Sequence, residues 1–544
     1  MKNKLLTSLL LPLLSVSIFS CSKGENYSDG KIFNDSFESN LSNWSSKGDK
    51  VDISSEYSFS GNKSLKMSNS SIVNQKIKNI KPGLYYLEVK TRNEGNQEYC
   101  YAYAKGSKQD DKMTSIPRSI KDNEWSTVTI RGIKVDSDGL LEVGFVNKGH
   151  NQSVYFDDVS LHLEARQDKE YPSLFGGAIS WLDWEIDKGA KYYDFDHVEK
   201  SALEIMKENG CNFVRLELYN NPGHYVDENG NYLPSGYKDE DAIYNLALMA
   251  KSMGMDIELS FMYSDYWGNS AIPYDWMDKI KDLSSFQDKV DSLSNSIYQF
   301  TYSFMNRLKN ANIYPKYVSI GNEIEAGILL PYGSTYEHPS ALADFLKSGY
   351  KAVKDVMSDS QVVLHLGANA DDMHWENKYG SGRYFFDLMN THHVPYDIIG
   401  TSYYPFWAQS DSEYAIKKKL DLVDLKNWCE LMIDTYDKDI LIMESGYNWG
   451  TPGQLANNGA YEGIYLSSKE GQRDYVLNLI NTIKSVKDGR CLGLLYWDPI
   501  LVRQSGVGYA LYDDGQVREN VVETTTFFSY DHVALPVLNA FRYN

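Results

Sequence analysis

The pattern of hydrophobic and polar positions changes once along the chain, close to residue 170. Residues 31–165 alternate apolar and polar side chains in short runs separated by turn residues, without an intervening helical period. Alternation with a period of two is typical of strands that bury one face. We therefore predict an all-β sandwich, with strands near 84–90, 99–104, 125–130, 140–145 and 154–161.

Beyond a polar linker at 166–173, residues 174–544 follow another rhythm, in which short apolar runs alternate with amphipathic helical patterns. Eight strand–helix alternations of this size predict an α/β fold, the (β/α)8 TIM barrel. The strands are expected near 174–180, 211–218, 255–262, 316–322, 361–367, 396–402, 439–444 and 491–497. Helices are expected at 198–209, 241–253, 286–311 and 341–357, with a last one near 534–541.

The N-terminus has the pattern of an export signal. A basic start is followed by an apolar run from Leu5 to Phe19, which is too short for a stable membrane span. Cys21 comes directly after that run and resembles the processing site of bacterial lipoproteins, which implies a signal peptide at 1–21 and a lipid anchor on Cys21. Ordinary signal cleavage nearby is the alternative. The polar stretch 22–30 is interpreted as a tether, and the protein is expected to be exported and membrane-anchored.

Composition narrows the class of partner. The 544 residues are 42% hydrophobic and include 42 Tyr and 11 Trp, which suits a large core and surfaces that stack on carbohydrate. Lys plus Arg number 54 against 74 Asp plus Glu, a net charge of −20, and this balance argues against a nucleic-acid partner. The remaining cysteines lie in apolar contexts without disulfide or metal spacing and are interpreted as buried free thiols: Cys100, Cys211, Cys429 and Cys491.

Two of the predicted barrel strands end in a glutamate. The segment 316–323 finishes in Gly-Asn-Glu323, and 439–444 finishes in Met-Glu444. Catalytic groups of such barrels lie at the C-terminal ends of the strands, so the two carboxylates are expected at one rim. A pair of facing carboxylates is what cleavage of a glycosidic bond needs. Asn322 can donate an amide hydrogen bond to a substrate hydroxyl.

Six motifs occur in order at strand ends: 212–222, Phe-Met-Tyr-Ser-Asp-Tyr-Trp at 261–267, Ile-Gly-Asn-Glu-Ile at 320–324, 399–407, Met-Glu-Ser-Gly-Tyr at 443–447 and 494–499. Together they resemble the endo-β-1,4-galactanases of glycoside hydrolase family 53. The resemblance covers residues 174–544. It implies a retaining mechanism with Glu323 as acid/base and Glu444 as nucleophile. The implied substrate is the β-1,4-linked (arabino)galactan of pectin side chains.

Further site residues follow from these segments. Arg215 is expected to bind a carboxylate and keep Glu444 ionised, or else to form a salt bridge in the barrel core. Asn322 would hold the sugar 2-hydroxyl, and Asp265 another hydroxyl. Aromatic candidates are Tyr403 or Tyr404 as donor to the nucleophile, Trp497 as the floor of a subsite, and Trp267 and Trp407 as stacking platforms or plain core.

The chain departs from the family pattern at Ser260, Met262 and Ala178, which leaves subsite contacts and product length open. No cofactor is expected. Some bacterial relatives carry calcium after strand seven, but here the loop 446–467 has a single acidic residue, so no metal is predicted there. A structural calcium at Asp157 or Asp158 has weak support from one acidic pair.

The N-terminal domain resembles jelly-roll carbohydrate-binding modules in its opening segment 34–44 and its closing segment 156–159. Tyr99, Tyr101 and Tyr103 alternate and so share one face of a strand. That face is either an aromatic platform for sugar rings or half of the sandwich core.

Two rival functions are a different β-1,4-glycanase of the same barrel clan, such as a mannanase or xylanase, and a surface glycan-binding lipoprotein without catalysis. The segments at 263–265 and 402–405 favour a galactanase, and the two intact glutamates argue against a non-catalytic protein. A monomer is expected.

Overall fold

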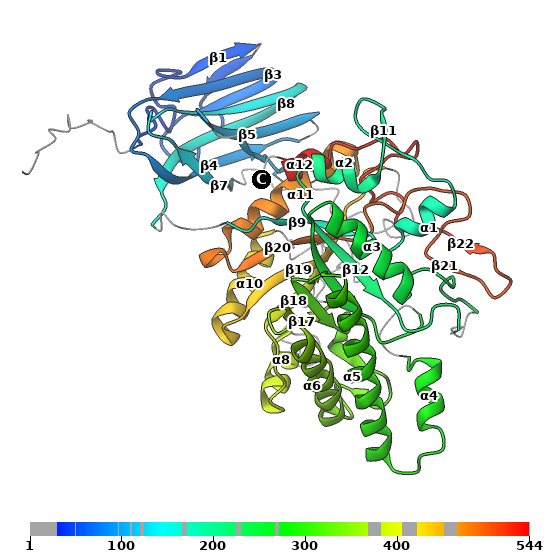
Figure 1. Cartoon of the computed structure of the whole chain (residues 1–544). Helices are drawn as coiled ribbons and strands as arrows, with labels where there is room; N and C mark the ends of the chain where they lie inside the picture. The colour runs from blue at the N-terminus through cyan, green and yellow to red at the C-terminus, as the bar shows by residue number, and fades with distance from the viewer. Residues whose placement is uncertain are drawn as a thin grey trace, which may run out of the picture.

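The computed structural model describes residues 30–48, 50–95, 97–108, 111–119, 125–165, 171–224, 230–266, 271–367, 382–404, 422–450 and 465–542. They form an antiparallel β-sandwich that lies against the outside of a parallel barrel (Figure 1). Several predicted features fall outside the described residues: the signal segment with Cys21, Trp267, Trp407 and most of the loop 446–467.

The barrel is closed by eight parallel strands, as the rhythm of apolar runs predicts. In spatial order they are β9 (Leu174–Ala178), β12 (Phe213–Leu218), β13 (Asp256–Phe261), β14 (Tyr317–Ile320), β17 (Gln361–Leu366), β18 (Ile398–Tyr403), β19 (Asp439–Ser445) and β20 (Cys491–Tyr496). Each strand falls within or next to a predicted run. Their side chains are buried almost throughout, which is why the runs are continuously apolar rather than alternating.

Inside the barrel, side chains form layers. Phe213, Tyr317, Val363 and Ile398 belong to one apolar cluster in the barrel interior. Two residues further along β12, the inward position is Arg215, because successive side chains on a strand alternate between its faces. Polar side chains therefore occupy the layer above the apolar one, towards the C-terminal rim.

Helices surround the barrel: α1 (Leu182–Asp187), α2 (Ala202–Glu208), α3 (Glu240–Ser252), α4 (Tyr274–Ile280), α5 (Phe286–Asn310), α6 (Pro339–Val356), α8 (Gly382–Thr391), α10 (Leu422–Tyr436), α11 (Lys469–Ser485) and α12 (Leu538–Arg542). The predicted helix 198–209 begins later, at Ala202, because Glu199 and Lys200 form strand β11 and pair with β10 (Tyr192–Tyr193). Ser201 then caps α2 by accepting from the Glu204 amide.

The sandwich contains β1 (Ser45–Gly48), β2 (Val51–Ser54), β3 (Ser64–Ile77), β4 (Gly83–Asn93), β5 (Tyr99–Gly106), β6 (Lys112–Ser115), β7 (Ser126–Val135) and β8 (Leu141–Leu163). The prediction of two strands at 140–145 and 154–161 is wrong, since both belong to the single strand β8. Its first half pairs with β5 and its second half with β4, so the polar stretch between them bends the strand without ending it.

The tyrosine face of β5 points away from the sandwich core. Cys100, Ala102 and Ala104 belong to the core cluster, and Tyr99 and Tyr101 project from the opposite face. Their ring centroids are 5.7 Å apart. The interpretation as half of the sandwich core is therefore wrong for Tyr99 and Tyr101. Tyr103, the third tyrosine of this face, is buried outside the core cluster, and its hydroxyl donates to Glu142 Oε1 at 2.7 Å.

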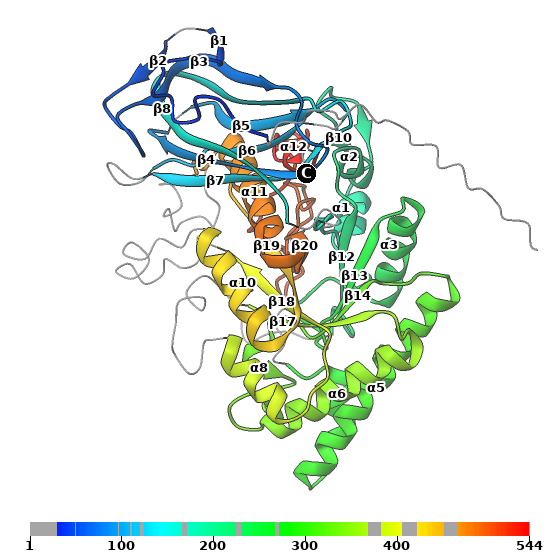
Figure 2. The same ribbon diagram turned by 90° about the vertical axis from the view of Figure 1, so that its left-hand side faces the viewer.

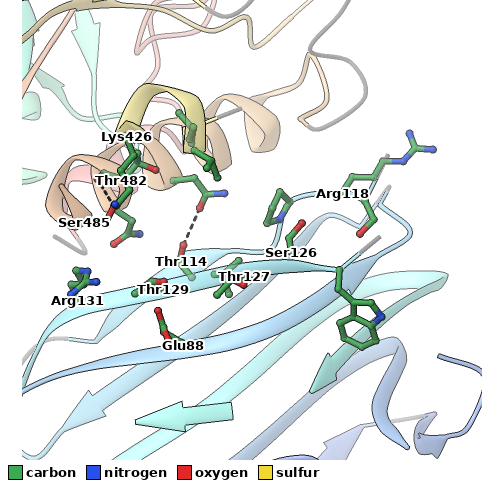
Figure 3. A pocket seen from close by; sticks show the side chains of 18 of the residues that line it. Glu88, Thr114, Arg118, Ser126, Thr127, Thr129, Arg131, Lys426, Thr482 and Ser485 are labelled. Atoms are coloured by element: carbon green, nitrogen blue, oxygen red, sulfur yellow. Dashed lines mark hydrogen bonds between the residues drawn. The ribbon is translucent and has the colours of Figure 1, made fainter. Parts of the chain in front are cut away.

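The two domains contact each other directly. Thr114 donates to Asn478 Oδ1 at 3.0 Å, Ser115 donates to the Asp474 carbonyl at 3.0 Å, and Asn481 donates to the Met113 carbonyl at 3.0 Å. A cavity of about 580 Å³ lies beside these contacts, with β7 on one side and α10 and α11 on the other (Figure 3). In two views at right angles, α11 lies next to the sandwich, where it contacts β6 and β7 (Figures 1 and 2).

Two further findings concern the described residues alone. Cys100, Cys211, Cys429 and Cys491 are buried and free, which confirms the interpretation of the cysteine spacing. No helix among the described residues is long and apolar enough to cross a membrane.

Candidate active site

The turn after β14 directs Glu323 to the barrel rim. Gly321 has φ +95°, and a Cβ there would lie 2.5 Å from Ile324 Cγ2, so the chain needs glycine at this position. Glu323 itself has left-handed backbone angles, φ 47° and ψ 57°, and leads into the short helix η1 (Ile324–Ala326). Such backbone angles in a residue other than glycine are costly and cluster at functional sites.

Glu444 is the penultimate residue of β19, which is separated from β14 around the barrel by β17 and β18. A carboxylate oxygen of Glu323, one of Glu444 and a ring nitrogen of His365 all lie within 4.8 Å of one another. A short separation of this kind suits direct attack by one carboxylate, since water between two carboxyl groups needs about 6.5–9.5 Å.

Arg215 and Tyr404 hold Glu444 from two sides. Arg215 is fully buried, and its Nη1 donates to Glu444 Oε1 at 2.5 Å. The Tyr404 hydroxyl donates to Oε2 at 3.0 Å. Arg215 Nη2 donates to Asn322 Oδ1 at 2.5 Å, which directs the amide nitrogen of Asn322 away from the guanidinium. Of the two tyrosines that the sequence proposed as donors, Tyr404 reaches Glu444, and Tyr403 lies in the hydrophobic core.

Glu323 has a different environment. The Ser402 hydroxyl donates to Glu323 Oε1 at 2.6 Å, and His365 Nε2 lies 2.9 Å from the same hydroxyl. Burial raises the pKa of Glu323 to about 8, and Glu444 and Glu325 act in the same direction. Burial also holds the pKa of His365 well below its ordinary value, so the ring is neutral. The two glutamates thus sit in environments suited to different tasks.

Sequence reasoning missed the positions of His365 and Ser402. Both are polar residues at inward positions near the ends of otherwise apolar strands, β17 and β18. That signal was available, because a buried polar side chain in a barrel strand needs a partner inside the barrel.

The other predicted site residues are placed as follows. Both oxygens of Asp265 accept backbone amides, from Asn221 at 2.9 Å and from Tyr274 at 2.8 Å, so this carboxylate organises two loops. Trp497 is half-buried and meets the Tyr404 ring edge-on, with centroids 6.0 Å apart. Ser260, one of the departures from the family pattern, accepts a hydrogen bond from Arg215 Nε at 3.0 Å and so helps to hold the guanidinium.

Asp157 of the sandwich accepts the backbone amides of Phe59 at 2.7 Å and Ser60 at 3.2 Å. Asp158 accepts from the Ser60 hydroxyl at 2.6 Å. In this arrangement the two carboxylates fasten the loop before β3 to strand β8.

Comparisons with known proteins agree with this geometry. Residues 174–541 match the family model described as glycosyl hydrolase family 53. An arabinogalactan endo-beta-1,4-galactanase of Thermothelomyces thermophilus is 28% identical over 377 residues, which cover 67% of this chain and 98% of that protein.

Among solved structures, the GH53 catalytic domain of Ignisphaera aggregans is 30% identical, with a TM-score of 0.57, and the match covers 68% of this chain and 96% of that one. A fungal beta-1,4-galactanase shares the fold at 24% identity and a TM-score of 0.53, with 69% and 100% of the two chains covered. With the family model spanning the whole barrel and both glutamates at its rim, the chain belongs to glycosyl hydrolase family 53.

Proposed function

We propose that this chain is a retaining, endo-acting hydrolase of β-1,4-galactosidic bonds in (arabino)galactan, with Glu323 as acid/base and Glu444 as nucleophile. The observation that carries the proposal is the pair of rim carboxylates within 4.8 Å, in a barrel of family 53. The substrate class rests on the relatives, several of which are named arabinogalactan endo-beta-1,4-galactanases.

The proposed reaction has two steps. Glu444 attacks the anomeric carbon while Glu323 gives its proton to the departing oxygen, so a glycosyl ester forms as the glycosidic bond breaks. Glu323, now ionised, takes a proton from water, and the resulting attack releases the sugar and frees Glu444. Arg215 and Tyr404 orient the nucleophile through their hydrogen bonds to it. The Asn322 amide nitrogen would donate to the sugar 2-hydroxyl, since the amide oxygen is occupied by Arg215. These steps use protein groups and water.

Galactan hydrolysis should retain the anomeric configuration. Two carboxyl groups this close leave no room for a water between the base and the sugar carbon. Proton NMR of the first minutes of hydrolysis should show the β-anomer of the new reducing end, followed by mutarotation. An α-anomer as the first product would contradict the proposed nucleophile.

The alkaline limb of the activity profile should lie near pH 8. Glu323 is protonated below its raised pKa of about 8 and can then act as the acid, so kcat/KM falls as pH rises through that value. The Ser402 hydrogen bond opposes this rise in pKa, so Ser402→Ala should move the alkaline limb to higher pH. The measurement is kcat/KM on galactotetraose between pH 6 and 10. Thr401→Val is the matched control, because the Thr401 hydroxyl donates to a backbone carbonyl.

We further propose that the sandwich binds the polymer through the face of Tyr99 and Tyr101, since two adjacent, half-exposed rings on the sheet face opposite the core offer a stacking platform for sugars. Tyr101→Ala should weaken retention on insoluble galactan at least about fivefold and leave turnover of galactotetraose unchanged. Tyr86→Ala is the control, because Tyr86 lies on β4 and stacks on His162. Equal retention of both variants would contradict the proposal.

Export and anchoring through lipidated Cys21 complete the proposal, supported by the basic and apolar pattern that precedes this cysteine. The protein would act as a monomer at the membrane surface. Mass spectrometry of the membrane fraction would detect the lipidated N-terminal peptide, and Cys21→Ala should release the enzyme.

A further inference from the structure

Arg215 has more carboxylate neighbours than it can neutralise. Besides Glu444, its guanidinium lies 3.5 Å from Glu217 and 3.5 Å from Glu258. Both of these carboxylates are buried, on β12 and β13, and neither was recognised from the sequence. A buried carboxylate without a cation is costly, so three acids compete for the one positive charge of Arg215.

Lys238 adds a second positive charge. Its Nζ lies 2.5 Å from Glu217 Oε2 and 4.1 Å from the centre of the Trp181 ring, and the side chain is fully buried. The residue lies just before α3, where its carbonyl accepts the Tyr219 amide at 2.9 Å. That backbone hydrogen bond fastens the lysine segment to the end of β12, the strand that carries Arg215 and Glu217.

The other ionisable groups around Arg215, Glu217 and Lys238 are Glu258, Asp498, Glu444, Glu323, His365 and Tyr219. Burial raises the pKa of Glu258 to about 7, against the opposing influence of Arg215. Burial also raises the pKa of Asp498, although the positive charge of Lys238 opposes this rise. Glu217 differs, because Lys238 and then Arg215 outweigh its burial and lower its pKa. Glu217 is therefore ionised beside Arg215, and Lys238 is the cation that compensates it.

We propose that Lys238 is a positioning residue of the active site. It neutralises the charge of Glu217, so that the positive charge and the hydrogen bond of Arg215 act on Glu444. The inference rests on the proposed function of Glu444 as nucleophile. Without Lys238, Arg215 would be the only cation near both Glu217 and Glu444. Glu444 would then lose part of its counter-charge and of its fixed orientation. The pair Glu217–Lys238 would then set the lowest pH at which the nucleophile is competent.

The test uses three variants and measures the position of the acid limb of kcat/KM, which should shift in opposite directions in the two single variants and stay in place in the double variant. Lys238→Met removes a positive charge and should move the acid limb of kcat/KM on galactotetraose up by about one pH unit. Glu217→Gln removes a negative charge and should move it down by a similar amount. The double variant removes the pair and should return the limb to within about 0.3 of the wild-type position.

A purely structural role would lower activity in all three variants without opposite shifts of the limb, and that result would overturn the proposal. Lys484→Met is the matched control, since Lys484 is a buried lysine on α11 with the Phe175 ring 5.6 Å away, and it should leave the acid limb unchanged. If Lys238→Met does not fold, the other two variants still test the proposal. Glu217→Gln must shift the acid limb down, and the double variant must leave it near the wild-type position.

A second readout separates this inference from the proposed function. Glutamate labelled with ¹³C at the side-chain carboxyl allows the Glu444 resonance to be assigned by comparison with Glu444→Gln and titrated without substrate. The midpoint should move up in Lys238→Met, down in Glu217→Gln and return in the double variant, even if wild-type protein proves inactive on galactan. Identical midpoints in all four proteins would refute the role of Lys238.

Discussion

Replacing either rim glutamate should abolish most of the activity: Glu323→Gln and Glu444→Gln are each expected to lower kcat on β-1,4-galactan by at least about 10³-fold. That factor corresponds to about 4 kcal/mol of transition-state stabilisation. The amide at 444 cannot attack the anomeric carbon, and the amide at 323 cannot give up a proton at the required moment. The loss is large because each carboxylate performs a step that the other cannot.

The measurement is reducing-sugar release by purified protein whose circular dichroism and melting temperature match the wild type. Glu185→Gln is the matched control, because Glu185 is also buried and burial raises the pKa of its carboxyl to about 9, so it is already neutral at pH 7. This variant should stay within about threefold of wild type. Near-normal rates in either rim variant would contradict the assignment of Glu323 as acid/base and Glu444 as nucleophile, and therefore the proposed reaction.

The two rim variants should also differ from each other. With an aryl galactobioside whose leaving group needs no acid, Glu323→Gln should accumulate a glycosyl-enzyme, because the first step proceeds and the second lacks its base. Intact-protein mass spectrometry would show the added sugar on Glu323→Gln and none on Glu444→Gln. The reverse result would exchange the roles of the two residues.

Turnover on β-1,4-galactan should exceed that on xylan, mannan or carboxymethylcellulose by at least about 10²-fold in kcat/KM, some 2.7 kcal/mol. The axial 4-hydroxyl of galactose bends the chain, whereas cellulose is flat. A cleft shaped for a bent chain holds the scissile bond of other polymers out of line, and positioning carries much of the rate. Trp497 beside Tyr404 is the described aromatic candidate for a platform at the site.

The comparison requires kcat/KM for each polymer under one set of conditions. Trp497→Ala should reduce the rate on galactan more than on an aryl galactoside, since only the polymer depends on the platform for alignment. Comparable wild-type rates on mannan or xylan would favour the rival β-1,4-glycanase function, and no hydrolysis of any polymer would favour a glycan-binding protein.

Much of the fold followed from local patterns. The eight barrel strands are apolar runs of strand length, and burial on both faces makes such runs conspicuous. The sandwich was predicted from alternation, which reports one buried face. Local patterns fail where a long-range contact decides. The polar stretch inside β8 predicts a break between two strands, although neighbouring strands pair with Asn147, Lys148 and His150 in its first part.

The sequence by itself predicted the order of the barrel strands along the chain, the two rim glutamates, and Arg215 and Asn322 as their candidate neighbours, because these residues lie in or directly after apolar runs of strand length. It left Tyr403 and Tyr404 as alternatives. Only the tertiary structure decided the pairings. Arg215 and Glu444 are 229 residues apart, and Ser402 and Glu323 are 79 apart, so their contacts depend on how the barrel closes and on the register of its strands. The same closure surrounds Lys238 and Glu217 with buried charges from other strands, since which buried acid meets which cation is a property of the packed interior and not of any local segment.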